Sequence, residues 1–318
     1  MSDILARVAR KEIEAQDIVS IELERADGKA LPAFSAGSHI DVHVGSGLTR
    51  QYSLCNDPSE RHRYVIGVLR DPASRGGSLA LHEKINVGDV ISISEPRNHF
   101  SLEPAKRSIL LAGGIGVTPI LCMAERLSQI NADFEFHYCA RSAEKAAFRD
   151  RMSNSPFASR VHFHFDDGPS EQRLDMIGLL ENPKPDAHIY VCGPSGFITL
   201  VTNVAAEKGW AGGQVHFEYF SAGPVDTSND GSFDVKIASS GRVYRIPAKV
   251  TVVAALAEHG VHIPISCQEG VCGTCVTRVL EGTPDHRDYY FTARERARND
   301  QFTPCCSRAA SAMLVLDL

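Results

Sequence analysis

The sequence lacks the features that would assign the chain to a membrane, to secretion or to a nucleic acid. No apolar run approaches the roughly 20 residues that a membrane-spanning helix needs. The N-terminal stretch MSDILARVARK has no apolar core of the signal-peptide kind, so we expect a cytoplasmic protein. Lysine and arginine number 33 against 39 aspartates and glutamates, and the net charge of −6 gives no reason to expect a nucleic-acid surface.

Internal repeats and low-complexity tracts are also missing. Apolar residues make up 43% of the chain and charged residues 23%, which are ordinary values for a globular protein. A length of 318 residues is enough for two or three domains, each with its own core.

Residues 1–104 consist mainly of short runs in which apolar and polar residues alternate. Examples are IVSIELER, SHIDVHV and RYVIGVLR, and turn residues separate them. Only one short helix is expected, at Ser78–Ile85. The pattern predicts an antiparallel β-barrel.

The sequence pattern changes twice in the rest of the chain. In residues 105–222, apolar strands alternate with helical stretches, which predicts a doubly wound α/β domain with a parallel sheet. Residues 223–232 are small and polar and are interpreted as a linker. Residues 233–318 form a compact unit of strands, one helix and a cysteine-rich loop, which predicts an α+β domain.

The cysteine-rich loop, SCQEGVCGTC, carries Cys267, Cys272 and Cys275, three of the nine cysteines. The spacing C-x4-C-x2-C with a later cysteine is that of plant-type [2Fe–2S] ferredoxins. Its glycines let backbone N–H groups approach the sulfurs. Zinc is the main alternative, but zinc sites usually pair C-x2-C with a second such pair or with two histidines. Disulfides are rare in the cytoplasm, and the fourth ligand is either Cys305 or Cys306.

Two glycine-containing loops follow predicted strands of the α/β segment. The first, GGIGVTP, contains Gly113, Gly114, Gly116, Thr118 and Pro119. Glycines let the backbone approach a pyrophosphate, and we expect Thr118 to cap the following helix and Pro119 to lie in its first turn.

The second loop is Cys192-Gly193-Pro194, at the end of the strand HIYVC. Ligands of open parallel sheets bind at the carboxyl ends of strands, so two such loops predict a nucleotide site. The alternatives are an ordinary strand–helix turn and a buried structural thiol at Cys192.

The barrel segment offers a set of residues suited to a phosphorylated aromatic ligand. Arg50 can grip a phosphate, Tyr52 offers a flat ring and Ser53 offers a hydroxyl donor. The run Ser74–Ser78, SRGGS, precedes the short helix. The alternative is an ordinary barrel strand with an exposed arginine and a core tyrosine.

These motifs together resemble the phthalate dioxygenase reductase family over the whole chain. The resemblance rests on RQYSLCN with SRGGS, GGIGVTP with CGP, and the cysteine pattern, and extends to EPRNHF, HFEYF, PDHRD and CCSRA. It implies a ferredoxin-reductase-like FMN barrel, an NAD domain and a C-terminal β-grasp [2Fe–2S] ferredoxin domain.

Carried onto this chain, the resemblance implies specific roles. Arg50 and Ser78 hold the FMN phosphate, and Tyr52 and Ser53 line the flavin ring, with Ser53 near its N5 atom. Phe220 shields the ring, and Glu218 lies near it. The other expected flavin-side residues are Leu54, Gly67, Val68, Gly76 and Gly77.

On the nucleotide side, the resemblance assigns the pyridine nucleotide to Gly113, Gly114, Gly116, Thr118 and Pro119. Cys192 and Gly193 lie near the nicotinamide, so the expected catalytic residues are Ser53, Cys192 and Phe220. Arg141 follows the second strand, where the ribose is discriminated. The family implies NADH, although an arginine there also suits the 2′-phosphate of NADPH. In the cluster, the family's fourth ligand is separated from SRA by one residue, so the resemblance implies the set Cys267, Cys272, Cys275 and Cys305.

The expected function is therefore a reductase that passes electrons from NADH through FMN and the [2Fe–2S] cluster to a Rieske-type oxygenase. Two alternatives stay open: an NAD(P)H flavin reductase or diaphorase with a different acceptor, and a redox sensor without catalysis.

Overall fold

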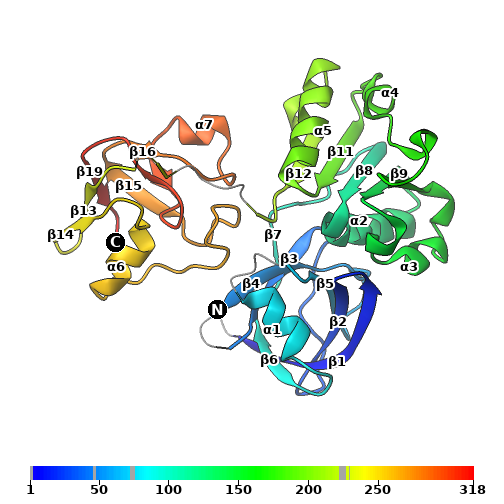
Figure 1. The fold of residues 1–318 in the computed structure, drawn as a ribbon, viewed down its shortest axis with the longest axis horizontal. Helices are drawn as coiled ribbons and strands as arrows, with labels where there is room; N and C mark the ends of the chain where they lie inside the picture. Colours follow the sequence, from blue (N-terminus) through cyan, green and yellow to red (C-terminus); the bar gives the residue numbers. More distant parts are fainter. Residues whose placement is uncertain (1–2, 46–47, 72–75, 222–226, 229) are drawn as a thin grey trace. The chain divides into compact units, whose positions relative to one another are not determined.

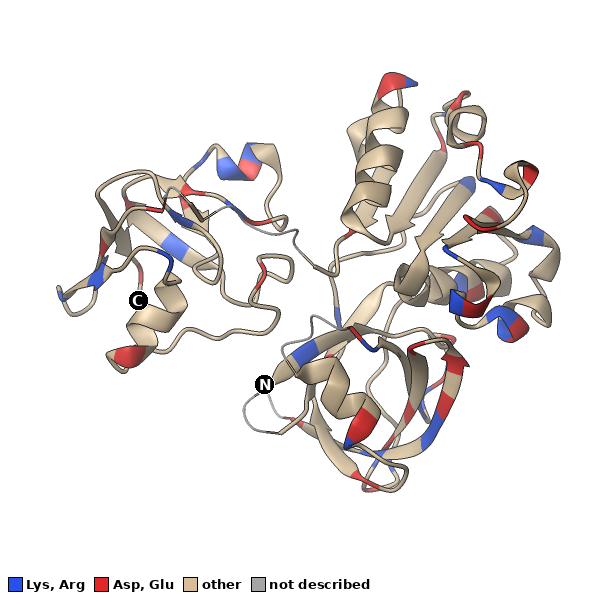
Figure 2. Ribbon diagram, in the orientation of Figure 1, with Lys and Arg blue, Asp and Glu red and all other residues tan. Residues whose placement is uncertain are grey.

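The computed structural model describes residues 3–45, 48–71, 76–221, 227–228 and 230–318 (Figure 1). The chain divides into two compact units, Met1–Phe220 and Ser221–Leu318. Among the described residues, no helix combines the length and the apolar character needed to cross a bilayer. Figure 2 shows positively and negatively charged residues interspersed over both units.

The first half of the first unit is an antiparallel sheet that closes on itself. Its strands pair in the order β4-β3-β6-β1-β2-β5, and β7 pairs with β3. An antiparallel bridge between Leu54 and Ile66 joins the two ends of this order and closes the barrel. The strands are β1 (Ile4–Ala15), β2 (Ile18–Arg25), β3 (Ser38–His43), β4 (Thr49–Ser53), β5 (Tyr64–Leu69), β6 (Val90–Ile93) and β7 (Arg97–Asn98).

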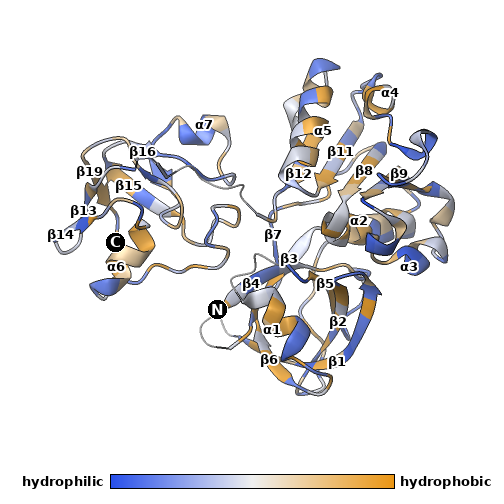
Figure 3. Ribbon diagram, viewed as in Figure 1, coloured by the Kyte–Doolittle hydropathy of each residue, from blue (hydrophilic) through white to orange (hydrophobic). Residues whose placement is uncertain are grey.

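The barrel interior forms because side chains alternate between the two faces of each strand. Ile4, Ala6 and Val8 of β1 are buried, whereas Leu5 and Arg7 between them are exposed. Figure 3 shows the same mixture of hydrophobic and hydrophilic residues along the barrel strands. Helix α1 (Gly77–Glu83) contributes Leu81 to this core.

The second half of the first unit is a parallel sheet with strand order β10-β9-β8-β11-β12. Helices α2 and α3 pack with one face of the sheet, and α4 and α5 pack with the other. This is the predicted doubly wound arrangement. The strands are β8 (Arg107–Gly113), β9 (Asp133–Ala140), β10 (Val161–Phe165), β11 (Ala187–Cys192) and β12 (Val215–Glu218), and the helices are α2 (Val117–Gln129), α3 (Arg149–Ser153), α4 (Met176–Leu180) and α5 (Ser195–Glu207).

The strand order reverses between β8 and β11, which are adjacent and parallel. Chain connections leave such a pair of strands in opposite directions, so their carboxyl ends frame the usual ligand site of an open α/β sheet. Both predicted glycine loops follow these two strands.

The second unit has a mixed sheet in the order β14-β13-β19-β15-β17 and a two-stranded sheet of β16 and β18. Helix α6 packs on the mixed sheet through Val252, Ala255 and Leu256. The elements are β13 (Phe233–Ile237), β14 (Val243–Ile246), α6 (Val252–Glu258), β15 (Thr277–Glu281), β16 (Pro284–Asp285), α7 (Ala293–Arg296), β17 (Gln301–Phe302), β18 (Arg308–Ala309) and β19 (Met313–Leu316). The predicted fold classes are confirmed for the barrel, the α/β sheet and the α+β unit.

Candidate functional site

The two glycine loops of the parallel sheet are pressed against each other. Cys192 stands beside Ala112 in the β8–β11 register. A Cβ atom on Gly193 would lie 2.9 Å from the Cα of Gly113, and a Cβ on Gly116 would overlap the carbonyl of Cys192. Glycine is therefore required for this close approach. The structure brings four predicted nucleotide residues together here: Gly113, Gly116, Cys192 and Gly193.

The predicted capping role of Thr118 is wrong. A short 3₁₀ turn, Gly114–Gly116, directly precedes α2, so Gly116 is the N-cap residue of that helix. Thr118 is already inside the helix, and its hydroxyl donates to the carbonyl of Ile115 over 3.1 Å. Pro119 lies in the first turn, as expected.

Thr118 instead packs against the barrel. Its methyl carbon would lie 2.7 Å from a Cβ placed on Gly67 of β5, and the Phe148 ring is 3.1 Å from the same point. Gly67 therefore gives the room in which the barrel and the α/β half of the first unit meet. Any role of Gly67 in holding a flavin stays a prediction, as it does for Leu54 and Val68, whose side chains are buried in the barrel core.

Ser53 of the barrel and Glu218 of the parallel sheet are brought together. The Ser53 hydroxyl donates to Glu218 Oε2 over 3.4 Å, and Glu218 stands next to Cys192 in the register of β11 and β12. Burial raises the pKa of the Glu218 carboxyl to about 8, although the Ser53 hydrogen bond opposes this. Burial and the nearby Glu218 raise the pKa of the Cys192 thiol. The sheet edge thus holds a serine hydroxyl, a carboxyl and a thiol that favour their uncharged forms at neutral pH.

Sequence reasoning placed Glu218 near the expected flavin and nicotinamide but did not single it out as a catalytic residue. The stretch HFEYF alternates like an ordinary final strand, so its pattern alone gives no sign of a carboxyl with a raised pKa. Only the packing of β12 beside β11, and of the end of β12 against the end of β4, reveals the contact with Ser53.

The predicted phosphate residues gather around the start of α1. Arg50 of β4 lies over Gly77, because a Cβ on Gly77 would be 2.5 Å from Arg50 Cγ. The Ser78 hydroxyl accepts a hydrogen bond from the backbone N–H of Asp71 over 3.4 Å. Gly76 is the residue that precedes the helix. Ser74 and Arg75 of the same motif lie outside the described residues.

Tyr52 is partly buried and packs against the barrel core, and burial raises the pKa of its hydroxyl. Arg141 follows β9 directly and is exposed, and its carbonyl accepts from the backbone N–H of Asp167 over 3.2 Å. Carboxylates near this position usually bind a ribose hydroxyl, so Asp167 is a neighbour of Arg141 that the sequence pattern did not indicate. Phe220, with 37% of its surface exposed, ends the first unit.

In the second unit, the cysteine loop and a distant segment place four thiols together. The Cys267 thiol hydrogen-bonds with the thiols of Cys272 and Cys305, and Cys305 also hydrogen-bonds with Cys275. All four residues are buried. These thiol contacts, joined by backbone N–H groups of Glu269 and Val271, lower the pKa of Cys267 to about 2. The same contacts raise the pKa values of the Cys272 and Cys305 thiols, so the group favours one thiolate among hydrogen-bonded thiols.

Two glycines shape the loop. Gly270 has φ +72° and Gly273 has φ +70°, the left-handed region that favours glycine. A Cβ on Gly270 would overlap Cys306 Sγ, and one on Gly273 would overlap the ring of Tyr290. The loop is thus held tightly under a neighbouring segment, and both glycines are needed by conformation and by space.

Cys306 stands outside the four-thiol group. Its Sγ lies 3.3 Å from the Thr303 hydroxyl and packs under Gly270, and its thiol contact is with Cys305. Among the described residues, no group of three or more His, Cys, Asp or Glu side chains is arranged to hold a single metal ion. The four thiols form one connected set of contacts, and a two-iron cluster distributes its thiolates over two metal ions.

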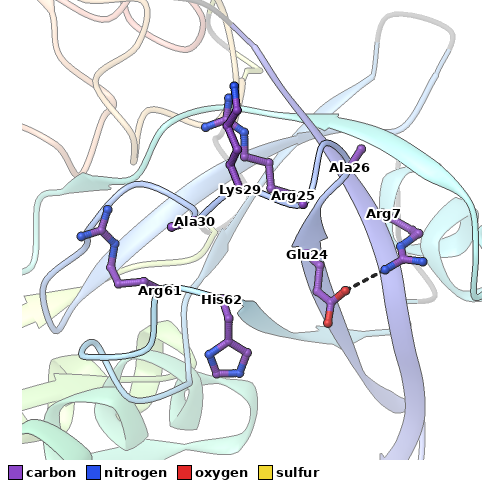
Figure 4. Close-up of a pocket in the computed structure, with 9 residues that line it drawn as sticks. Arg7, Glu24, Arg25, Ala26, Lys29, Ala30, Arg61 and His62 are labelled. Atoms are coloured by element: carbon purple, nitrogen blue, oxygen red, sulfur yellow. Dashed lines mark hydrogen bonds and ion pairs between the residues drawn. The ribbon is translucent and has the colours of Figure 1, made fainter.

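A separate surface pocket of about 690 Å³ lies on the barrel (Figure 4). Figure 4 shows Arg7 paired with Glu24, a contact of 2.8 Å, and the basic residues Arg25, Lys29 and Arg61 around the same recess. None of the predicted flavin, nucleotide or cluster residues lines it. The recess is therefore distinct from the residues that carry the chemical motifs.

Comparisons with known proteins agree with this organisation. Residues 235–310 match a family model described as a 2Fe-2S iron-sulfur cluster binding domain. The chain is 56% identical over 315 residues to the vanillate O-demethylase oxidoreductase of Pseudomonas putida, covering 98% of this chain and 99% of that one. It is 40% identical over 314 residues to the phthalate dioxygenase reductase of Burkholderia cepacia, covering 98% and 96% of the two chains.

Among solved structures, phthalate dioxygenase reductase, described as a modular structure for electron transfer from pyridine nucleotides to [2Fe-2S], superimposes with a TM-score of 0.79. The two sequences are 39% identical, and the match covers 100% of this chain and 98% of that one.

Proposed function

Because the chain belongs to the phthalate dioxygenase reductase family, we propose that it is the NADH-dependent reductase component of a two-component Rieske-type oxygenase. Electrons pass from NADH to FMN, then to the [2Fe–2S] cluster, and finally to the oxygenase component. The identity to vanillate O-demethylase oxidoreductases favours an aromatic demethylase, with vanillate as its substrate.

The four-thiol group carries this proposal. We assign Cys267, Cys272, Cys275 and Cys305 as the cluster ligands. Cys267 contacts both Cys272 and Cys305, and Cys305 also contacts Cys275, so the four thiols lie close enough together to hold one cluster. Backbone N–H groups support the sulfurs: Glu269 donates to Cys267 over 3.3 Å and Thr274 to Cys272 over 3.5 Å. Such hydrogen bonds stabilise a more negative cluster.

The barrel residues fit an FMN by their chemistry. Arg50 supplies a guanidinium beside the start of α1, where Ser78 supplies a hydroxyl, and both suit a phosphate. Tyr52 supplies a ring for stacking, and Phe220 supplies a second aromatic side chain. When bound, the flavin takes a hydride from the nicotinamide and releases its electrons singly, as a one-electron cluster requires.

The residues of the sheet edge orient the nicotinamide and control protons. The loops at Gly113 and Gly193 bring backbone close to the nucleotide, and the start of α2 offers N–H groups for its pyrophosphate. The hydroxyl of Ser53 in the barrel contacts Glu218 of the parallel sheet. A Glu218 that stays protonated near pH 7 would place no negative charge at this sheet edge and could exchange a proton there.

Further parts of the proposal rest on the same reasoning. We divide the chain at residues 104, 222 and 232 into a flavin domain, a nucleotide domain, a linker and a ferredoxin domain. We place the protein in the cytoplasm, where thiols stay reduced and available to iron. NADH is assigned as the donor on family grounds. Arg141 is the residue that would favour NADPH, through its 2′-phosphate.

Reconstitution tests the proposal. Purified reductase, NADH and a vanillate demethylase oxygenase component are mixed, and oxygen use and demethylated product are measured. Coupled oxygen use and product formation, absent without the reductase, is the expected result. Rapid reduction of free flavin or ferricyanide, with no electron delivery to any Rieske-type oxygenase tested, would instead favour the diaphorase alternative.

A further inference from the structure

The segment that covers the cluster loop is held in place by its own hydrogen bonds. The backbone N–H of Tyr289 donates to the Gly270 carbonyl over 3.0 Å. The buried carboxylate of Asp288 accepts from the Phe291 N–H over 2.8 Å and from the Ser307 hydroxyl over 3.4 Å. The side chain of Arg296 donates to the Asp288 carbonyl. The segment from Asp288 to Arg296 is therefore a rigid rim of the loop that carries three of the four proposed ligands.

Large side chains are exposed on this rim and at the start of the cysteine loop. Tyr289 exposes 43% of its surface, and Ile265, two residues before Cys267, exposes 38%. Tyrosine side chains that are held rigidly and exposed commonly serve as anchors of protein interfaces, because they bury much area at little entropic cost. Electrons must leave the cluster through the protein nearest to its thiols. Ile265 lies two residues from Cys267, and the Tyr289 backbone is bonded to the loop at Gly270.

Exposed arginines also lie on this rim and just after it. Arg294 and Arg298 are exposed, and among the described residues neither forms an ion pair with a carboxylate. Arg287, by contrast, is neutralised by Asp230 and Asp285, both at 2.7 Å. Glu295 is engaged in capping α7, where it accepts from the Thr292 hydroxyl over 2.7 Å. Arg298 also lies close enough to Glu295 to lower the pKa of that carboxyl, without forming an ion pair with it. In a chain with a net charge of −6, two exposed arginines within ten residues of the exposed tyrosine favour an acidic partner surface.

We propose that Ile265, Tyr289, Arg294 and Arg298 form the face that docks on an acidic surface around the electron-accepting centre of the oxygenase component. This face, named here the cluster rim, rests on the function proposed above. Ile265 and Tyr289 supply the buried centre of the interface. Arg294 and Arg298 lie at its edge and accelerate association.

The variants Tyr289→Ser and Ile265→Ser test the apolar part. The control is Val243→Ser, which removes a side chain that is 54% exposed on β14, at the opposite edge of the sheet from β17. Cluster absorbance and NADH–ferricyanide activity should be unchanged in all three. The KM for the oxygenase should rise by about 10-fold in Tyr289→Ser with little change in kcat, and Tyr289→Phe should restore most of the lost affinity.

The charge variants Arg294→Glu and Arg298→Glu test the acidic partner, with Arg242→Glu on the β13–β14 turn as the control. Each rim variant should lower kcat/KM for the oxygenase by several-fold at low salt, and the difference from wild type should shrink as salt is added. The control should match the wild-type protein.

The outcomes separate this proposal from the function on which it rests. A wild-type protein that reduces no oxygenase contradicts the proposed function itself. If the wild type is active and Tyr289→Ser gives the same KM as Val243→Ser, the cluster rim is not the docking face. Slower reduction of the cluster by NADH in Tyr289→Ser would also overturn the proposal, because the face would then serve transfer within the chain.

Discussion

At the scale of single residues, two adjacent cysteines differ sharply in their surroundings. Cys305 hydrogen-bonds with Cys267 and Cys275, whereas Cys306 packs against Thr303 and Gly270. The sequence spacing alone left both as possible ligands, and the contacts agree with the choice of Cys305 that the family resemblance implied.

The variants Cys305→Ser and Cys306→Ser turn this difference into a prediction. Cys305→Ser should lose the brown colour and most of its iron, because one of four thiolates is gone. Cys306→Ser should keep about two irons per chain. Iron analysis and visible absorbance measure both. The assignment is wrong if Cys306→Ser is the colourless protein.

The Glu218 carboxyl makes a second prediction at this scale. Burial raises its pKa from 4.5 to about 8, so the folded protein favours the protonated form. The stability that Glu218 contributes is complete below about pH 4.5 and is lost as pH rises through about 8. Because Glu218 is partly exposed, we expect a loss of about 2 kcal/mol rather than the full value of the shift.

Thermal unfolding of the first unit at about pH 5.5 and pH 8.5 tests this. Glu218→Gln should be more stable than wild type at the higher pH and should show a weaker pH dependence. The exposed Glu171→Gln variant is the control and should follow the wild-type curve. Identical pH profiles for Glu218→Gln and wild type would show that this carboxyl is ionised in the folded protein.

At the scale of elements, the meeting of the β8 and β11 loops brings together the residues proposed to bind the nucleotide. Gly116→Ala should disturb it, because the added Cβ overlaps the Cys192 carbonyl. We expect a loss of about 1–3 kcal/mol in stability and a marked rise in the Kd for NADH. The matched control is Gly196→Ala in α5, where a Cβ meets nothing within 4 Å and alanine favours the helix.

Urea unfolding and NADH titration distinguish the two alanine variants. The account expects a large effect from Gly116→Ala and a neutral or slightly stabilising effect from Gly196→Ala. Equal NADH affinity in the two would mean that the close approach of these loops does not shape the nucleotide site.

The strands and helices of the chain were largely predictable from local pattern, because burial imposes a period of two on strands and of 3.6 on helices. The start of α2 was not. A threonine before a proline is a common cap signature, but the 3₁₀ turn at Gly114–Gly116 moved the helix start upstream. Three-dimensional contacts between distant segments, such as Ser53 with Glu218, have no local signature in the sequence.

At the scale of the whole molecule, three motif sets far apart in the sequence describe one electron path. The barrel, the α/β sheet and the cysteine loop each carry the motif for one cofactor, and no one of them can carry out the electron transfer alone. Together they connect a two-electron donor to a one-electron acceptor. The family resemblance predicted from these motifs is confirmed by full-length relatives at 40–56% identity. The face proposed to meet the oxygenase could not be predicted from pattern, because exposure and ion pairing are properties of the folded surface.

Stopped-flow spectroscopy with NADH tests the central claim most directly, with flavin and cluster absorbance followed separately. The account predicts that flavin absorbance bleaches first and that cluster absorbance bleaches afterwards. Cys305→Ser should retain only the first phase. Reduction of the cluster in protein stripped of flavin, at the rate seen in the complete protein, would contradict the account.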